Sequence, residues 1–139
     1  MEQVLCYWPD PSCPEAAAAR RAMLPLKLRI RTADPTQTGQ TVGHLIGRKE
    51  FPAQEAAGST VTDPILILDG LSGTKINALL AALAKAKVPR AVFKAVVTQD
   101  NINWTLTQLW EELSREREAI EQGELAEHTE VERESGAHR

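Results

Sequence analysis

The segment from Thr98 to Trp104 gathers side chains that are well suited to bind a ligand. Its residues read TQDNINW, and a strand-like run, KAVV, comes directly before it. Hydroxyl and amide groups supply hydrogen-bond donors and acceptors, and an indole supplies a flat stacking surface. Open α/β sheets bind ligands at the carboxyl ends of their strands, beside helix N-termini. The segment therefore predicts a binding site formed by Thr98, Asn101, Asn103 and Trp104.

The same segment also allows a purely structural interpretation. Asn101 or Asn103 can cap the helical pattern that follows, by accepting a hydrogen bond from a free backbone N–H group. Such a cap contributes about 1 kcal/mol, and helix starts often contain these residue types. Trp104 would then pack over the end of the preceding strand. The sequence leaves a binding site and a capped helix as open alternatives.

Cys13 is the candidate for nucleophilic chemistry. Residues 6–23 read CYWPDPSCPEAAAARRAM, and this order resembles the active-site region of glutaredoxins and thioredoxins, where a cysteine opens the first helix. A helix N-terminus lowers the pKa of a thiol and favours the reactive thiolate. Because Ala16 stands where a second cysteine would be, this alternative is a monothiol redox protein. An ordinary loop cysteine explains the same residue.

Composition and charge narrow the classes of function. Two cysteines and three histidines show no spacing typical of a metal site, so we expect no metal and no cofactor. The net charge of −3 divides into −6 for residues 111–139 and +3 for residues 1–110, which does not suggest a nucleic-acid partner. The longest apolar run, PILIL, is too short to cross a bilayer, and MEQVLCYW does not resemble a signal peptide. We expect a bacterial-type cytoplasmic protein that does not contact the membrane.

The elements that must position these residues follow one order in both halves of the chain. In residues 1–50 the patterns predict a strand QVLCYW, a helix EAAAARRAML, a strand LKLRIRT with alternating apolar and basic residues, and a helix TVGHLIG. Residues 64–122 repeat strand, helix, strand and helix, and the run ILIL is typical of a central strand. Residues 51–63 read as a linker, and residues 123–139 as an acidic, disordered tail.

The two halves also align residue by residue, which predicts an internal duplication. Thr41, Val42, Leu45 and Ile46 fall on Thr105, Leu106, Leu109 and Trp110. We therefore expect a pseudo-twofold α/β (α+β) domain, either ferredoxin-like or a small four-stranded sheet flanked by helices. The loop before the second helix, ADPTQTGQT, is as polar as the loop before the fourth, so the site is expected at this pair of loops.

The polar segment and the second helix also carry a family resemblance. They resemble the signatures of a small bacterial family catalogued as domain of unknown function 3783. The matching positions are Lys94, Ala95, Thr98, Asn101, Asn103 and Trp104 in the second half, and Gln40, Val42, Gly43 and Gly47 in the first. The resemblance implies no established activity, and it adds Lys94, Gln40 and Gly43 to the candidate binding residues.

Three functions remain after this comparison of motifs. The favoured one is a cytoplasmic, non-enzymatic binding or interaction module for an unknown small molecule or protein, with its site at the paired polar loops. It is favoured because no pair of acid and base, activated nucleophile or metal-binding group emerges from the spacing. The alternatives are a monothiol, glutaredoxin-like protein that uses Cys13, and a structural domain that forms a homodimer.

Overall fold

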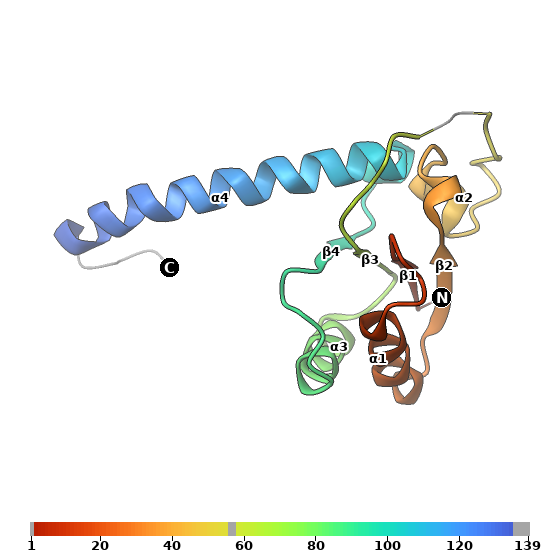
Figure 1. The fold of residues 1–139 in the computed structure, drawn as a ribbon, viewed down its shortest axis with the longest axis horizontal. Helices are drawn as coiled ribbons and strands as arrows, with labels where there is room; N and C mark the ends of the chain where they lie inside the picture. Colours follow the sequence, from red (N-terminus) through yellow and green to blue (C-terminus); the bar gives the residue numbers. More distant parts are fainter. Residues whose placement is uncertain (1, 56–57, 135–139) are drawn as a thin grey trace.

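The chain folds into a four-stranded sheet with two helices on each face (Figure 1). The computed structural model describes residues 2–55 and 58–134, and it describes side chains as far as residue 123. The predicted α/β class is confirmed. The elements are β1 (Gln3–Tyr7), α1 (Pro14–Met23), β2 (Arg29–Ala33), α2 (Val42–Leu45), β3 (Ile65–Asp69), α3 (Gly73–Lys85), β4 (Phe93–Val96) and α4 (Leu106–Glu134), with 3-10 helices at Leu24–Leu26, Pro35–Gln37 and Asn101–Asn103.

The strands lie in the order β2-β1-β3-β4. Strand β1 pairs parallel with β2 and antiparallel with β3, and β3 pairs parallel with β4. Of the two predicted architectures, this is the small four-stranded sheet, since the ferredoxin-like order of elements is β-α-β-β-α-β. The first two strands occupy one half of the sheet and the last two the other half. The internal duplication itself stays a prediction.

The two central strands are buried on both faces, as the apolar run of β3 predicts. Successive side chains of a strand point to opposite faces of the sheet. In β1, Val4 and Cys6 join the core beneath α1 and α3, whereas Leu5 and Tyr7 join the core beneath α2 and α4. The sheet therefore separates two hydrophobic cores, and each central strand contributes to both of them.

Strand β2 begins later than the sequence predicts. Pro25 does not end the preceding helix outright, because the chain continues through the 3-10 helix Leu24–Leu26. Lys27 then takes a left-handed conformation with φ of 60°, and regular pairing with β1 starts at Arg29. The basic residues of β2 do not all point freely into solvent, because Arg31 is half-buried and its Nε donates to the Gln3 Oε1 atom at 2.8 Å.

Helix α4 extends away from the sheet as a long arm (Figure 1). It runs to Glu134 and so enters the segment that the sequence assigns to an acidic tail. Residues 135–139 of that segment lie outside the described residues, and its disorder stays a prediction. Within the described residues, no helix combines the length and the apolar character that crossing a membrane requires.

Candidate functional site

The two polar loops that the sequence predicts as a site bind directly to each other. The backbone N–H of Val42 donates to the Trp104 carbonyl at 2.8 Å, and that of Leu106 donates to the Gln40 carbonyl at 3.0 Å. Thr41 and Thr105 thereby form an isolated antiparallel bridge at the starts of α2 and α4. We call residues 38–42 and 98–107 the loop clasp. Its backbone groups join the two halves of the chain.

The residues that cap the helices are threonines and not asparagines. The Thr105 hydroxyl accepts from the Gln108 N–H at 3.1 Å, and the Gln108 side chain accepts from the Thr105 N–H at 2.8 Å. At α2, Thr41 accepts from the His44 N–H in the same way. The predicted cap at Asn101 or Asn103 is therefore wrong. Those residues form a separate 3-10 helix, and Trp104 is extended, so α4 begins only at Leu106.

Asn101 holds the chain as it leaves β4. Its Oδ1 atom accepts from the Thr98 N–H at 2.8 Å, and its Nδ2 group donates to the Val96 carbonyl at 2.9 Å. The Thr98 hydroxyl accepts from the Asn101 N–H in return. Asn103, in contrast, is exposed, and its Nδ2 group donates to the Gln99 carbonyl at 3.1 Å. The predicted site residues thus lie together, but the polar atoms of Thr98 and Asn101 are used within the loop.

Gln40 and Gly43 hold the segment that follows α2. The Gln40 side chain donates to the Gln54 carbonyl at 2.7 Å and accepts from the Gln54 N–H at 2.9 Å. At Gly43, an added Cβ atom would lie 2.5 Å from two ring atoms of Phe51, so only glycine lets the ring pack this closely. The half-buried Trp104 packs against the core beneath α2 and α4. These contacts give the three residues structural roles, and ligand binding by them stays a prediction.

Lys94 lies apart from the loop clasp. It stands near the start of β4, where its Nζ group donates to the Val92 carbonyl at 3.0 Å and the Arg90 carbonyl at 3.3 Å. Partial burial lowers the pKa of Lys94, and the nearby charges of Arg117 and Arg90 lower it further. The structure therefore does not bring Lys94 together with the other predicted binding residues.

A buried polar network lies at the start of β1, and none of its residues is among the predicted site residues. Gln3 donates to the Asp69 carboxylate at 2.7 Å and to the Ile46 carbonyl at 3.0 Å, while Arg48 contacts both Asp69 oxygens at 2.9 and 3.0 Å. Arg31 completes the network by donating to Gln3. Buried polar groups need such partners, so the network is structural. Its sequence signal is a polar residue at the end of an otherwise apolar strand.

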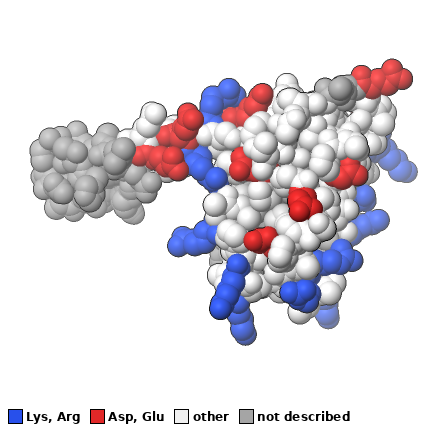
Figure 2. All heavy atoms as spheres, viewed as in Figure 1, with Lys and Arg blue, Asp and Glu red and all other residues white. Residues whose placement is uncertain are grey.

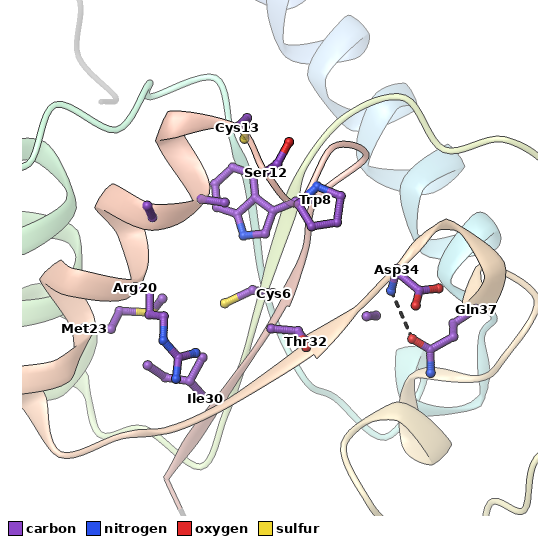
Figure 3. A pocket seen from close by; sticks show the side chains of 14 residues that line it. Cys6, Trp8, Ser12, Cys13, Arg20, Met23, Ile30, Thr32, Asp34 and Gln37 are labelled. Carbon is purple, nitrogen blue, oxygen red and sulfur yellow. Dashed lines mark hydrogen bonds between the residues drawn. The ribbon is translucent and has the colours of Figure 1, made fainter.

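A cavity of about 580 Å³ lies between α1 and β2, on the side of the sheet away from the loop clasp. Figure 3 shows its side chains arriving from the end of β1, from one side of α1 and from β2 with the turn after it. We call it the α1–β2 cavity. Its lining includes Cys6, Trp8, Ala17, Arg20, Ile30 and Asp34.

The walls of the α1–β2 cavity are mainly apolar. Trp8 and Met23 are buried there, and Ile30 packs against the same core. Burial raises the pKa of the Cys6 thiol to about 12, although the nearby charge of Arg20 acts in the opposite direction. Cys6 therefore stays a neutral thiol near pH 7 and serves as a packing group.

Charged groups border the cavity on two elements. Arg20 is exposed on α1, and within the described part of the chain its guanidinium makes no hydrogen bond and no ion pair. Asp34 follows β2, and its backbone N–H donates to the Gln37 side chain at 3.0 Å, the bond drawn in Figure 3. The sequence does not single out Arg20, since nothing in it shows which residues of a helix will face a cavity.

Cys13 occupies the position that the sequence assigns to it, directly before the first residue of α1. It is half-buried, and its side chain makes no capping hydrogen bond. Cys13 and Trp8 line both the α1–β2 cavity and a neighbouring one of about 360 Å³. Within the described residues, no group of three or more His, Cys, Asp or Glu side chains could hold a metal ion. A redox role for Cys13 stays a prediction.

Comparison with known proteins identifies one family. Neither the curated proteins nor the solved structures yield a match to this chain. A family model does match residues 64–120, which comprise β3, α3, β4 and the first part of α4. The loop residues Thr98 to Trp104 lie inside the match, whereas Gln40 and Gly43 lie before it. The predicted resemblance is thus confirmed over residues 64–120, which match the family described as Domain of unknown function (DUF3783).

Proposed function

We propose that this protein is a non-enzymatic binding module that takes up a small organic molecule in the α1–β2 cavity. The size and place of this cavity carry the proposal. Small-molecule sites typically have volumes of about 300–1,000 Å³, and the cavity of about 580 Å³ falls within that range. Its lining residues Trp8 and Asp34 follow the parallel strands β1 and β2, and open α/β sheets bind ligands at such strand ends.

The lining residues are suited to holding a ligand and not to reacting with it. Ligand sites combine apolar walls with a few polar groups that fix orientation, and here Trp8 and Ile30 supply the walls while Arg20 and Asp34 supply charge. The neutral Cys6 thiol is not a nucleophile near pH 7, because the thiolate is the reactive form. A module that holds its ligand without reacting with it fits this combination.

In this proposal the loop clasp acts as a support for the cavity rim. The rim residue Asp34 begins the 3-10 helix Pro35–Gln37, which leads directly into Thr38 of the clasp. The Thr38 carbonyl accepts from both the N–H and the hydroxyl of Thr107 at 3.1 Å. These bonds tie the end of the rim to α4, so the clasp residues contribute to binding by fixing the shape of the site.

A thermal-shift screen tests the proposal. Nucleotides, phosphorylated metabolites and amino acids are screened against the wild type, and each hit is repeated with Ala17→Trp, which places an indole in the cavity from an exposed position on α1. A ligand at a hundred times its Kd stabilises a fold by about 2.7 kcal/mol, which is readily measured. We expect hits whose stabilisation is lost in Ala17→Trp.

Ala81→Trp is the matched control, because Ala81 is an exposed alanine of α3 that does not line the cavity. It should retain each hit at wild-type strength. A hit that survives in Ala17→Trp but disappears in Trp104→Ala would instead assign binding to the loop clasp. The absence of any hit with the wild type would contradict small-molecule binding as the function.

A further inference from the structure

The geometry points to an organic acid as the ligand of the α1–β2 cavity, with its anionic group on Arg20 and its flat apolar body beside Trp8. This inference rests on the function proposed above, because it identifies the chemical class of ligand that the same cavity would take. The anionic group can be a carboxylate, a sulfonate or a phosphate, since each accepts the paired hydrogen bonds that a guanidinium donates.

Arg20 carries the first part of the inference. Figure 3 shows its side chain reaching from α1 towards Ile30 on β2, below Cys6. Within the described residues its guanidinium has no carboxylate partner, so its donors are available to a ligand. Its charge acts on the interior of the cavity, because it opposes the rise in the pKa of Cys6. An anion at this place would meet a cation that is not yet neutralised.

The apolar walls determine the body of the ligand. The indole of Trp8 lies above Cys6 in Figure 3, and the chain buries it almost entirely, with 6% of the residue exposed. Met23 and Ile30 belong to the same hydrophobic core and complete this part of the lining. Because only a small part of the indole is open to the cavity, it favours a flat partner in edge-to-face contact, which is favourable between ring systems.

Asp34 limits the number of anionic groups that the ligand can carry. It stands apart from Arg20, at the other end of the lining in Figure 3. Its Oδ1 atom accepts from the Thr36 N–H at 2.9 Å and from the Thr36 hydroxyl, and its carboxylate also accepts from the Gln37 N–H in the capping box of the 3-10 helix Pro35–Gln37. A second anionic group near this carboxylate would be repelled, while a hydroxyl or amine could donate to it. The expected ligand therefore has one acidic end and one neutral or donor end.

Two fluorescent probes that differ in charge test the inference. 1-Anilinonaphthalene-8-sulfonate is an anion with a flat naphthalene ring, and N-phenyl-1-naphthylamine is its neutral counterpart without the sulfonate. Both are titrated into the full chain, as wild type, Arg20→Gln and Arg20→Lys. We expect Arg20→Gln to weaken the anionic probe by roughly tenfold or more, as losing hydrogen bonds to a charged group does. The neutral probe should change by less than about twofold, and Arg20→Lys should retain part of the affinity for the anion.

Arg21→Gln serves as the matched control, because Arg21 is the exposed neighbour on α1 and does not line the cavity. Equal weakening of both probes in Arg20→Gln, or equal loss of the anionic probe in Arg21→Gln, would overturn the preference for an anion while leaving the cavity as a site. Failure of the wild type to bind either probe, or unchanged binding in Ala17→Trp, would overturn the proposed function itself. Melting curves of each variant identify any loss of binding that comes from unfolding.

Discussion

Two asparagines in the loop clasp make very different contributions, although the sequence treats them alike. Asn101 is largely buried and makes two side-chain hydrogen bonds to the backbone, whereas Asn103 is exposed and makes one. Asn101→Ala leaves the Thr98 N–H and the Val96 carbonyl without these partners, so we expect it to lower the free energy of unfolding by about 2 kcal/mol. Asn103→Ala should cost less than about 0.5 kcal/mol. Urea denaturation of both variants measures the difference.

The comparison separates a structural role of the clasp from a binding role. If Asn103→Ala leaves stability unchanged but abolishes a thermal-shift hit, Asn103 contacts the ligand and the predicted loop site is correct. If both variants bind as the wild type does, the clasp serves the fold alone. A loss of stability in Asn103→Ala as large as that in Asn101→Ala would contradict the difference in burial.

Cys6 makes the stability of the protein depend on pH in the alkaline range. Burial raises the pKa of its thiol from 9.0 to about 12 in the folded state, so the folded state favours the protonated form. Below pH 9.0 both the folded and the unfolded state keep this proton, and the contribution to stability is complete. Between pH 9.0 and about 12 only the unfolded state releases it, so the free energy of unfolding falls by about 1.4 kcal/mol per pH unit.

Cys6→Ala isolates this effect, because Tyr7 and Lys94, whose pKa values the fold also shifts, are present in both proteins. Denaturation at a series of pH values should give the wild type a steeper alkaline fall than Cys6→Ala, even though the variant is less stable near pH 7 through the lost packing. Equal slopes would show that Cys6 ionises as easily in the folded state as in the unfolded state. The same result would reopen a reactive role for this thiol.

At the scale of elements, the sequence predicts structure well where a local rule applies. The run ILIL predicts the central strand β3, and α1 begins at Pro14, a residue type that is common at the first helical position. Both depend on local rules, the burial of a continuous apolar run and the fixed φ of proline. These rules do not predict the start of β2, because Lys27 takes a left-handed conformation there and lysine is not a residue type that indicates such a turn.

The loop clasp shows what such local sequence rules do not predict. The sequence predicts that two polar loops precede α2 and α4, and the structure confirms their positions. It does not reveal that Val42 donates to Trp104, or that Gln40 holds Gln54, because such bonds join residues that are distant along the chain. A polar residue held by a buried backbone group has the same sequence signature as one that awaits a ligand. Only the hydrogen-bond partners distinguish these two cases.

At the scale of the molecule, the α1–β2 cavity is the feature least accessible from sequence. Its lining comes from β1, α1, β2 and the following turn, and none of these segments carries a recognisable binding motif. Among the predicted site residues, Cys13 alone lines this cavity, and the sequence singled it out as a candidate nucleophile and not as part of a ligand site.

The distribution of charge is another property of the whole molecule. In Figure 2 the Lys and Arg side chains surround the lower part of the body, where Figure 1 places α1 and α3. An anionic ligand would approach Arg20 from this basic part of the molecule.

The long helix α4 provides a prediction about the whole molecule. Its first part is fixed to the body, because Leu106 and Leu109 are buried, the Trp110 indole donates to Asp63 at 2.8 Å, and Arg117 stacks 3.7 Å from the centre of the Phe93 ring. Farther along, Ile120 is 62% exposed. We expect a chain that ends at residue 122 to keep its melting temperature within about 2 °C of the full chain, because the deletion removes none of these contacts.

A shorter chain that ends at residue 112 is the control for this deletion. It lacks Leu113 and Arg117, which pack against the body, and should melt well below the full chain. Light scattering on the full chain and the 122-residue chain then tests the predicted homodimer. A dimer that persists in the shorter chain would place the contact on the folded body, and one that dissociates would place it on the α4 arm. A marked loss of stability on ending the chain at residue 122 would show instead that the arm is part of the folded unit, and the predicted domain boundary would be wrong.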